Sequence, residues 1–161
     1  MSSTTKIVIA VVAAVIIVGV IWWFFSSPRQ SSAGRRFSAT LSGNNVVPPN
    51  PTSATGNASA LLNGPALGYN ITISGLPTVA SAGIYNAAAG QNGSIVKTLT
   101  FTDTADPLTK VSSGVWNNLD ASEPLTPEIL TLLTSSQLYV QVSSAGTPAA
   151  IIRGQLIPLV T

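Results

Sequence analysis

The sequence of 161 residues contains no cysteine and no histidine. The absence of cysteine excludes disulfides, thiolate nucleophiles and metals bound through cysteine. The absence of histidine excludes an imidazole general base, zinc or copper bound through histidine, and a Ser-His-Asp triad. We therefore expect no cofactor and no metal, and a carboxylate site for Ca²⁺ or Mg²⁺ is the one metal site left open.

Charge is also scarce, because charged residues make up 7% of the chain against about 25% in typical domains. The net charge of +2 comes without a basic patch interleaved with aromatics, so we expect no nucleic-acid partner. Polarity comes instead from Ser, Thr, Asn and Gln. That composition suits a β-rich domain with a hydroxyl and amide surface, or a surface covered by neighbouring proteins.

Residues 7–25 form an uncharged apolar run at the N-terminus. At about 1.5 Å per residue, a helix of this length covers roughly 28 Å, close to the hydrocarbon thickness of a bilayer. The run predicts a single transmembrane helix, with the lipid bilayer as a partner. Aromatic and basic residues at its two ends are candidates for the membrane interface: Lys6, Trp22, Trp23, Arg29, Arg35 and Arg36.

Two other interpretations of this run fit less well. A cleaved signal peptide has a shorter apolar region and small residues before its cleavage site. A buried core helix would have a polar face, which this run lacks. Residues 1–6 then form a tail, residues 26–36 a polar linker and residues 37–161 the folded domain. The excess of basic residues after the span favours a cytoplasmic location for the domain.

Alternation of apolar and polar residues dominates the domain and predicts strands. Phe37, Ala39 and Leu41 share one face, and so do Leu67, Tyr69, Ile71 and Ile73. Further strands are expected at residues 94–102, 137–144 and 149–158, with Gly, Pro and Asn turns between them. This spacing predicts an all-β fold, an antiparallel Greek-key-like sandwich or barrel.

One short helix is expected in "LTPEILTLLTSS". Thr126 can cap its N-terminus, Pro127 suits the first helical position and Glu128 favours the positive end of the helix dipole. The apolar side chains that follow predict a helix that covers one end of the sheet: Ile129, Leu130, Leu132 and Leu133.

Four motifs in order resemble those of a CHRD (chordin-type) domain, over about residues 37–156. They are the opening "FSATLSGNNVVPPNP", the central "GYNITISGL", the turn and strand "AAAGQNGSIVKTL", and the closing "LYVQVSSAGTPAAIIRGQL". The resemblance implies a compact β-domain with an extracellular binding role.

The chain departs from the family pattern where relatives usually carry ionisable side chains. The family's Ala-His-Ile-His is replaced here by Ala-Gly-Ile-Tyr, so Gly83 and Tyr85 stand at its histidine positions. Ser143 replaces a third histidine, and Ile151 replaces an acidic residue. We interpret this region as a site that has lost its ionisable groups while the strand and turn are kept.

Three residues are candidates for protein contacts: Tyr85, Trp116 and Arg153. Trp116 could anchor a partner as aromatic hot spots do, or be buried against the helix. Arg153 could bind a ligand carboxylate, or serve the fold by satisfying carbonyls or an acid. Asp103 and Asp106 could contribute to a calcium loop, although a turn is the better reading because the EF-hand glycine and glutamate are missing.

Three hypotheses for function follow. The first is a non-enzymatic, membrane-anchored structural protein whose domain packs against other structural proteins of an assembly. Such an assembly includes a virion, where the chain would be a minor capsid protein that tethers an inner membrane to the capsid. The second is a surface-anchored extracellular binding module of CHRD type. The third is an enzyme, which would need two carboxylates that converge in a pocket.

Overall fold

The structure is a computed structural model that describes residues 34–144 and 150–159. The predicted transmembrane helix, with Lys6, Trp22, Trp23 and Arg29, lies outside the described residues and stays a prediction. Within the described residues, no helix has the length and apolar character needed to cross a membrane.

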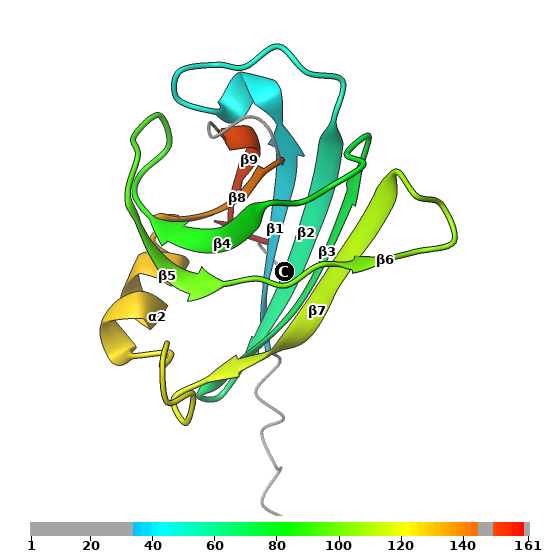
Figure 1. The fold of residues 1–161 in the computed structure, drawn as a ribbon. Coiled ribbons are helices and arrows are strands. Elements are labelled where there is room, and N and C mark those ends of the chain that lie inside the picture. Colours follow the sequence, from blue (N-terminus) through cyan, green and yellow to red (C-terminus); the bar gives the residue numbers. More distant parts are fainter. Residues whose placement is uncertain (1–33, 145–149, 160–161) are drawn as a thin grey trace, which may run out of the picture. The chain divides into compact units, whose positions relative to one another are not determined.

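The described residues form one antiparallel sheet of ten strands and a short helix (Figure 1). The sheet order is β5-β4-β8-β9-β1-β2-β3-β7-β6, and β10 pairs with β1. A 3-10 turn η1 (Gly43–Asn45) follows the first strand, and helix α2 (Pro127–Thr134) precedes the eighth. The strands are β1 (Arg35–Ser42), β2 (Thr55–Asn63), β3 (Ala66–Ser74), β4 (Ser81–Asn86), β5 (Ser94–Thr98), β6 (Thr102–Asp103), β7 (Thr109–Asn117), β8 (Leu138–Ser143), β9 (Ala150–Gln155) and β10 (Ile157–Pro158).

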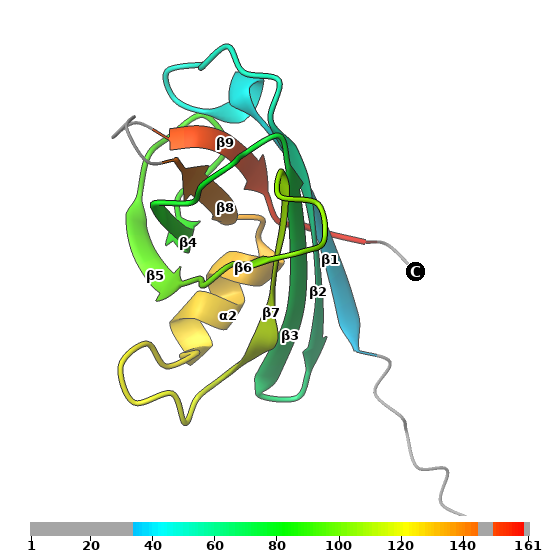
Figure 2. The same ribbon diagram turned by 45° about the vertical axis from the view of Figure 1, so that its right-hand side comes forward.

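The predicted all-β antiparallel architecture is confirmed, in the form of a curled sheet that makes a half-barrel (Figure 2). The strands do not divide into the two separate sheets of a sandwich, because β1 joins both halves. It pairs with β2 along its whole length and meets β9 at Ser42 and Arg153. The strands β4, β8 and β9 curl away from β1, β2 and β3, and the core lies in the concavity.

The predicted inward faces of the first strands are confirmed. Phe37 and Leu41 are buried, as are Leu67, Ile71 and Ile73, while Tyr69 is half-buried against the same core. The helix is confirmed as well, because the Thr126 side chain accepts a hydrogen bond from the Ile129 backbone N–H and Pro127 opens the first turn. Its apolar face packs on the core through Leu133 and its neighbours.

Two predicted strands are broken in the structure. Residues 94–102 form β5 and then cross to β6, which lies at the other edge of the sheet. Leu99 leaves the strand to enter the core, and its N–H is donated to Ala82 O at 3.0 Å. At the C-terminus, Leu156 separates β9 from β10 and donates its N–H to Leu138 O at 2.9 Å.

Strand β1 includes the last two residues of the segment predicted as a polar linker. Strand β1 begins at Arg35, which pairs with Leu62, and Arg36 pairs with Leu61. Both arginines are exposed. The pairing of β1 with β2 continues on the N-terminal side of Phe37. Arg35 and Arg36 therefore join the strand although their side chains are polar.

Candidate functional site

The covered face is the name we give to the outer face of β4, β8 and β9, which points away from the core. Alternation places Gly83 and Tyr85 on this face of β4, because Ala82 and Ile84 are buried in the core. The register then sets Tyr85 beside Tyr139, and Gly83 beside Gln141. Arg153 of β9 lies opposite Gln141.

A stack of three side chains occupies the middle of the covered face. The rings of Tyr85 and Tyr139 have centroids 5.3 Å apart and planes inclined by 13°. The Arg153 guanidinium carbon lies 3.5 Å from the centroid of the Tyr139 ring. Cation–π contacts of this kind are strongest where water is excluded, and Arg153 is only 2% exposed.

The buried charge of Arg153 is compensated by neutral groups. Its guanidinium donates to the Ala88 carbonyl at 3.1 Å and to Asn92 Oδ1 at 3.4 Å. Within the described residues no carboxylate forms an ion pair with it. Burial lowers the pKa of Arg153, and the neighbouring Tyr139 opposes that shift. Burial also raises the pKa of Tyr85, with a smaller contribution from Tyr139.

Amide side chains fasten two loops over the covered face. Asn45 donates to the Arg153 carbonyl at 3.1 Å, and Asn92 donates to the Val47 carbonyl at 3.0 Å. The Gly93 N–H is donated to the Tyr139 hydroxyl at 3.1 Å. The loops at residues 44–50 and 87–93 are therefore held to the sheet and to each other.

A cleft of about 370 Å³ lies between these loops. Tyr139 and Gln141 come from β8, and the other lining residues come from the two loops: Val46, Val47, Pro48, Pro49, Asn50, Asn92 and Gly93. A second cleft of about 320 Å³ includes Arg153 and Gln155 in its lining. Gln155 Oε1 is buried without a hydrogen-bond partner. The lining of the first cleft, of about 370 Å³, presents aliphatic, proline and amide groups to a ligand.

Most of the positions where the sequence departs from the CHRD pattern lie on the covered face. Alternation puts Gly83, Tyr85 and Ser143 on this side of β4 and β8, whereas Ile151 lies at an irregularity between β8 and β9 and packs in the core. Ile95 of the neighbouring β5 occupies the space over Gly83. A methyl group added to Gly83 would lie 2.5 Å from Ile95 Cδ1 and 2.9 Å from the Lys97 carbonyl. An imidazole therefore has no room at this position.

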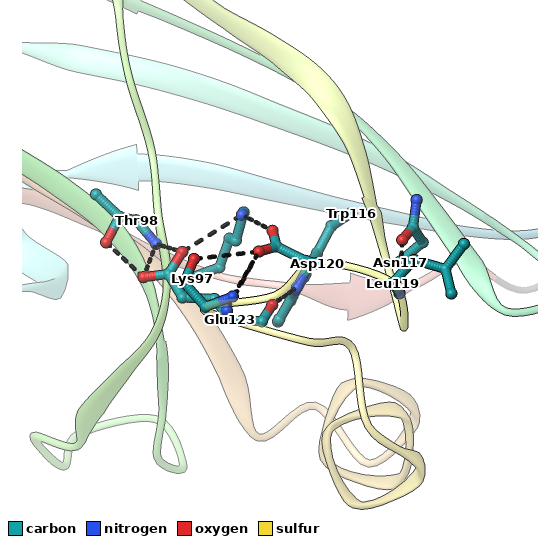
Figure 3. Close-up of polar contacts among 8 residues, drawn as sticks. Lys97, Thr98, Trp116, Asn117, Leu119, Asp120 and Glu123 are labelled. Carbon is teal, nitrogen blue, oxygen red and sulfur yellow. Dashed lines mark hydrogen bonds and ion pairs between the residues drawn. The ribbon is translucent and has the colours of Figure 1, made fainter.

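Two carboxylates meet elsewhere, at the edge of the sheet, where they converge on a lysine (Figure 3). Lys97 Nζ forms an ion pair with Asp120 and another with Glu123 at 3.3 Å. Glu123 also accepts hydrogen bonds from the Thr98 N–H and hydroxyl. We call this group the Lys97 clasp, because it joins β5 to the loop that follows β7.

Electrostatics in the Lys97 clasp keep both carboxylates ionised. The bond from Lys97 is the main cause that lowers the pKa of Asp120 to about 2, with help from the N–H groups of Glu123 and Ser122. Partial burial raises the pKa of Glu123, but bonds from Thr98 and Lys97 outweigh burial and lower it overall. Burial opposes the charge of Lys97, yet its two acidic partners raise its pKa.

Two of the three candidate contact residues lie in the interior, which agrees with the alternatives of burial for Trp116 and of a role in the fold for Arg153. Trp116 is fully buried and donates Nε1–H to the Glu123 carbonyl at 2.5 Å. Arg153 is also buried, so neither side chain faces a partner of the described domain. The bulk of the indole and the stacking of the guanidinium on Tyr139 explain this placement. Tyr85 is half-buried at the margin of the stack.

The structure does not support the hypothesis of a calcium loop at Asp103 and Asp106. Asp106 accepts bonds from the Leu108 N–H and the Thr109 hydroxyl, as a turn residue does. Asp103 forms an ion pair with Lys110 at 2.6 Å. Among residues 34–144 and 150–159, no three acidic side chains gather in a way that could hold a metal ion.

Sequence reasoning missed the Lys97 clasp and the amide fasteners Asn45 and Asn92. Lys97 lies more than twenty positions from both of its acidic partners, so no local spacing signals their contact. The repeated asparagines of the loops "GNNVVPP" and "GQNG" were a signal, since asparagine is common where side chains bond to nearby backbone.

Comparison with known proteins identifies the family. No curated protein and no solved structure matches the chain. A sequence model of the CHRD domain matches residues 37–156, which is most of the chain and nearly all of the half-barrel. Membership of this family suggests an extracellular binding module and gives no support to the capsid-tether hypothesis. The chain belongs to the CHRD domain family.

Proposed function

We propose that the chain is a non-enzymatic, membrane-anchored binding module that recognises a partner protein through the cleft on the covered face. The observation that carries the proposal is the neutral lining of this cleft of about 370 Å³. The stack of Arg153, Tyr139 and Tyr85 supports it from beneath. A preformed cleft with apolar walls and a few polar groups is the usual form of a binding site.

The acidic residues favour binding over catalysis. A carboxyl group that acts as a general acid near neutral pH needs a raised pKa. The pKa values of Asp106, Asp120, Glu123 and Glu128 are instead lowered, mostly by hydrogen bonds and ion pairs. The two that converge are neutralised in part by Lys97. They serve to join elements of the fold.

The chemistry of the cleft favours a neutral, extended segment of a partner. Pro48 and Pro49 offer an exposed apolar wall, and the Gln141 amide offers hydrogen bonds at the floor. An extended peptide satisfies both, because its side chains alternate with backbone groups that need hydrogen bonds. A strongly charged ligand would have no counter-charge in this lining.

A photo-crosslinker introduced at Pro48 of the full chain in cells tests the binding site. We expect a discrete crosslinked product with a second protein, and a loss of that product when Tyr85→Ala or Gln141→Ala is added. The matched control is the same crosslinker at Leu108, an exposed residue in the turn before β7. Equal products from both positions, or none from Pro48, would contradict the proposed site.

Labelling of intact cells tests the extracellular location. The chain lacks cysteine, so Leu108→Cys provides a single target for a membrane-impermeant maleimide. We expect labelling before lysis. Labelling that requires lysis would reject the extracellular location and agree with the orientation favoured by Arg29, Arg35 and Arg36.

A further inference from the structure

The open face is the name we give to the outer face of β1, β2, β3 and β7. Its middle row runs from Ser38 to Ser59, Asn70 and Ser113. A groove of about 630 Å³ crosses the end of this face at which β1 begins.

Apolar side chains line this groove although they are exposed to solvent. Val115 is 67% exposed, Leu159 47% and Leu61 42%. Gly68 lies between Leu61 and Val115 in the strand register, and a methyl group there would meet only the Leu61 carbonyl at 3.9 Å. The missing side chain of Gly68 therefore deepens the groove. Exposed apolar groups gathered in this way commonly mark an interaction surface.

Positive charge accompanies these apolar groups. Arg36 lines the groove, and Arg35 precedes it in β1. Within the described residues neither arginine forms an ion pair with an acid. Of the acids on the loop after β7, Asp120 and Glu123 are held by Lys97. Asp106 lies beyond the opposite end of β7, which begins at Thr109.

The chain itself limits how far this end can be from a bilayer. The predicted span ends at residue 25, and the described domain begins at Gly34. Eight residues between them reach about 28 Å at full extension. An anchor that ends at residue 25, as predicted, would keep the start of β1 within about this distance of the lipid surface.

We propose that the groove end of the open face docks on an anionic bilayer surface. Val115, Leu61 and Leu159 enter the headgroup region, and Arg36 beside them binds lipid phosphate or carboxylate groups. Arg35 does not line the groove, and it adds positive charge from the exposed end of β1. Basic residues at the edge of an apolar patch are the combination that holds proteins at such interfaces. The proposal depends on the predicted anchor but not on the cleft of the covered face, so each can fail alone.

A polarity-sensitive fluorophore attached to single cysteines tests this docking in the full chain. The variant Val115→Cys places the fluorophore in the groove, and Leu108→Cys is the matched control beyond the other end of β7. Both proteins are reconstituted in vesicles of phosphatidylcholine with about one third phosphatidylserine. A quencher carried on lipid headgroups reports contact with the surface.

We expect a blue-shifted emission and quenching at residue 115, with little of either at residue 108. Arg35→Gln with Arg36→Gln should reduce the quenched fraction by about half or more, because each arginine contributes roughly a fivefold preference for an anionic surface. Pure phosphatidylcholine vesicles should give a similar reduction. Equal quenching at both positions would overturn the proposal, as would quenching that is indifferent to the arginines and to phosphatidylserine.

A second copy of the chain is the competing occupant of the groove. A fluorophore that is blue-shifted but not quenched from the lipid phase would assign the groove to self-association and reject lipid docking.

Discussion

The covered face and the open face belong to one continuous sheet, yet the surroundings of their side chains differ. On the covered face, loops fastened by Asn45 and Asn92 enclose the Arg153 guanidinium, which is stacked on Tyr139. On the open face, Ser59, Asn70 and Ser113 point to solvent. The comparison indicates that substitutions on the covered face affect stability, whereas substitutions on the open face affect surface contacts.

The largest difference is expected between two arginines. Arg153→Ala removes a buried cation together with its bonds to Ala88 and Asn92, and leaves the Tyr139 ring partly uncovered. We expect a loss of about 3 kcal/mol in the free energy of unfolding. Arg36→Ala, at an exposed position of β1, should change it by less than about 0.5 kcal/mol. Chemical denaturation of both variants measures the difference, and similar losses would break the comparison.

The next largest difference in stability is expected between alanine substitutions of one glycine on each face. Gly83→Ala would press a methyl group against Ile95 and the Lys97 carbonyl, at a cost of about 1–3 kcal/mol from overpacking. Gly68→Ala meets no close neighbour and should be neutral or stabilising by up to about 1 kcal/mol, since glycine weakens a strand. Thermal unfolding gives both values. A Gly83→Ala protein of unchanged stability would mean that the Ile95 side chain can move away from the added methyl group at little cost in free energy.

These contrasts mark what the sequence could predict. Alternation identified the buried faces of β1 and β3, and the Thr126 cap with Pro127 identified α2. Alternation does not tell whether loops will cover the outer face, because that depends on contacts distant in sequence, such as Asn92 with Val47. Arg153 was correctly weighed as a residue that satisfies carbonyls, but its stacking on Tyr139 depends on the register of β8 and β9.

The Lys97 clasp should give the acid stability of the domain a recognisable profile. The pKa of Asp120 falls from 3.8 to about 2 in the folded chain. Its contribution to stability is therefore complete above the unfolded value and is lost as pH falls through the folded one. We expect Asp120→Asn to flatten the fall in stability between about pH 4 and pH 2. Denaturant midpoints across this range measure it, and Asp106→Asn, whose pKa is lowered by bonds within its own turn, should flatten the profile less than Asp120→Asn.

The smallest effect is expected on the middle of the open face. Ser59→Ala removes an exposed hydroxyl that donates to the Asn70 carbonyl at 3.4 Å. The free energy of unfolding should change by no more than about 0.5 kcal/mol. A larger loss, measured by chemical denaturation, would show that side chains in the middle of the open face also contribute to the free energy of unfolding.

The Lys97 clasp also affects the exposed edge of the sheet at β5. A half-barrel leaves β5 as an edge strand, and the unpaired N–H groups of such an edge can recruit another chain. Glu123 already accepts the Thr98 N–H at one end of β5. The ionised carboxylate stands where the backbone of an added strand would lie. The same group that ties two parts of the domain together thereby hinders the addition of another strand at this end of β5.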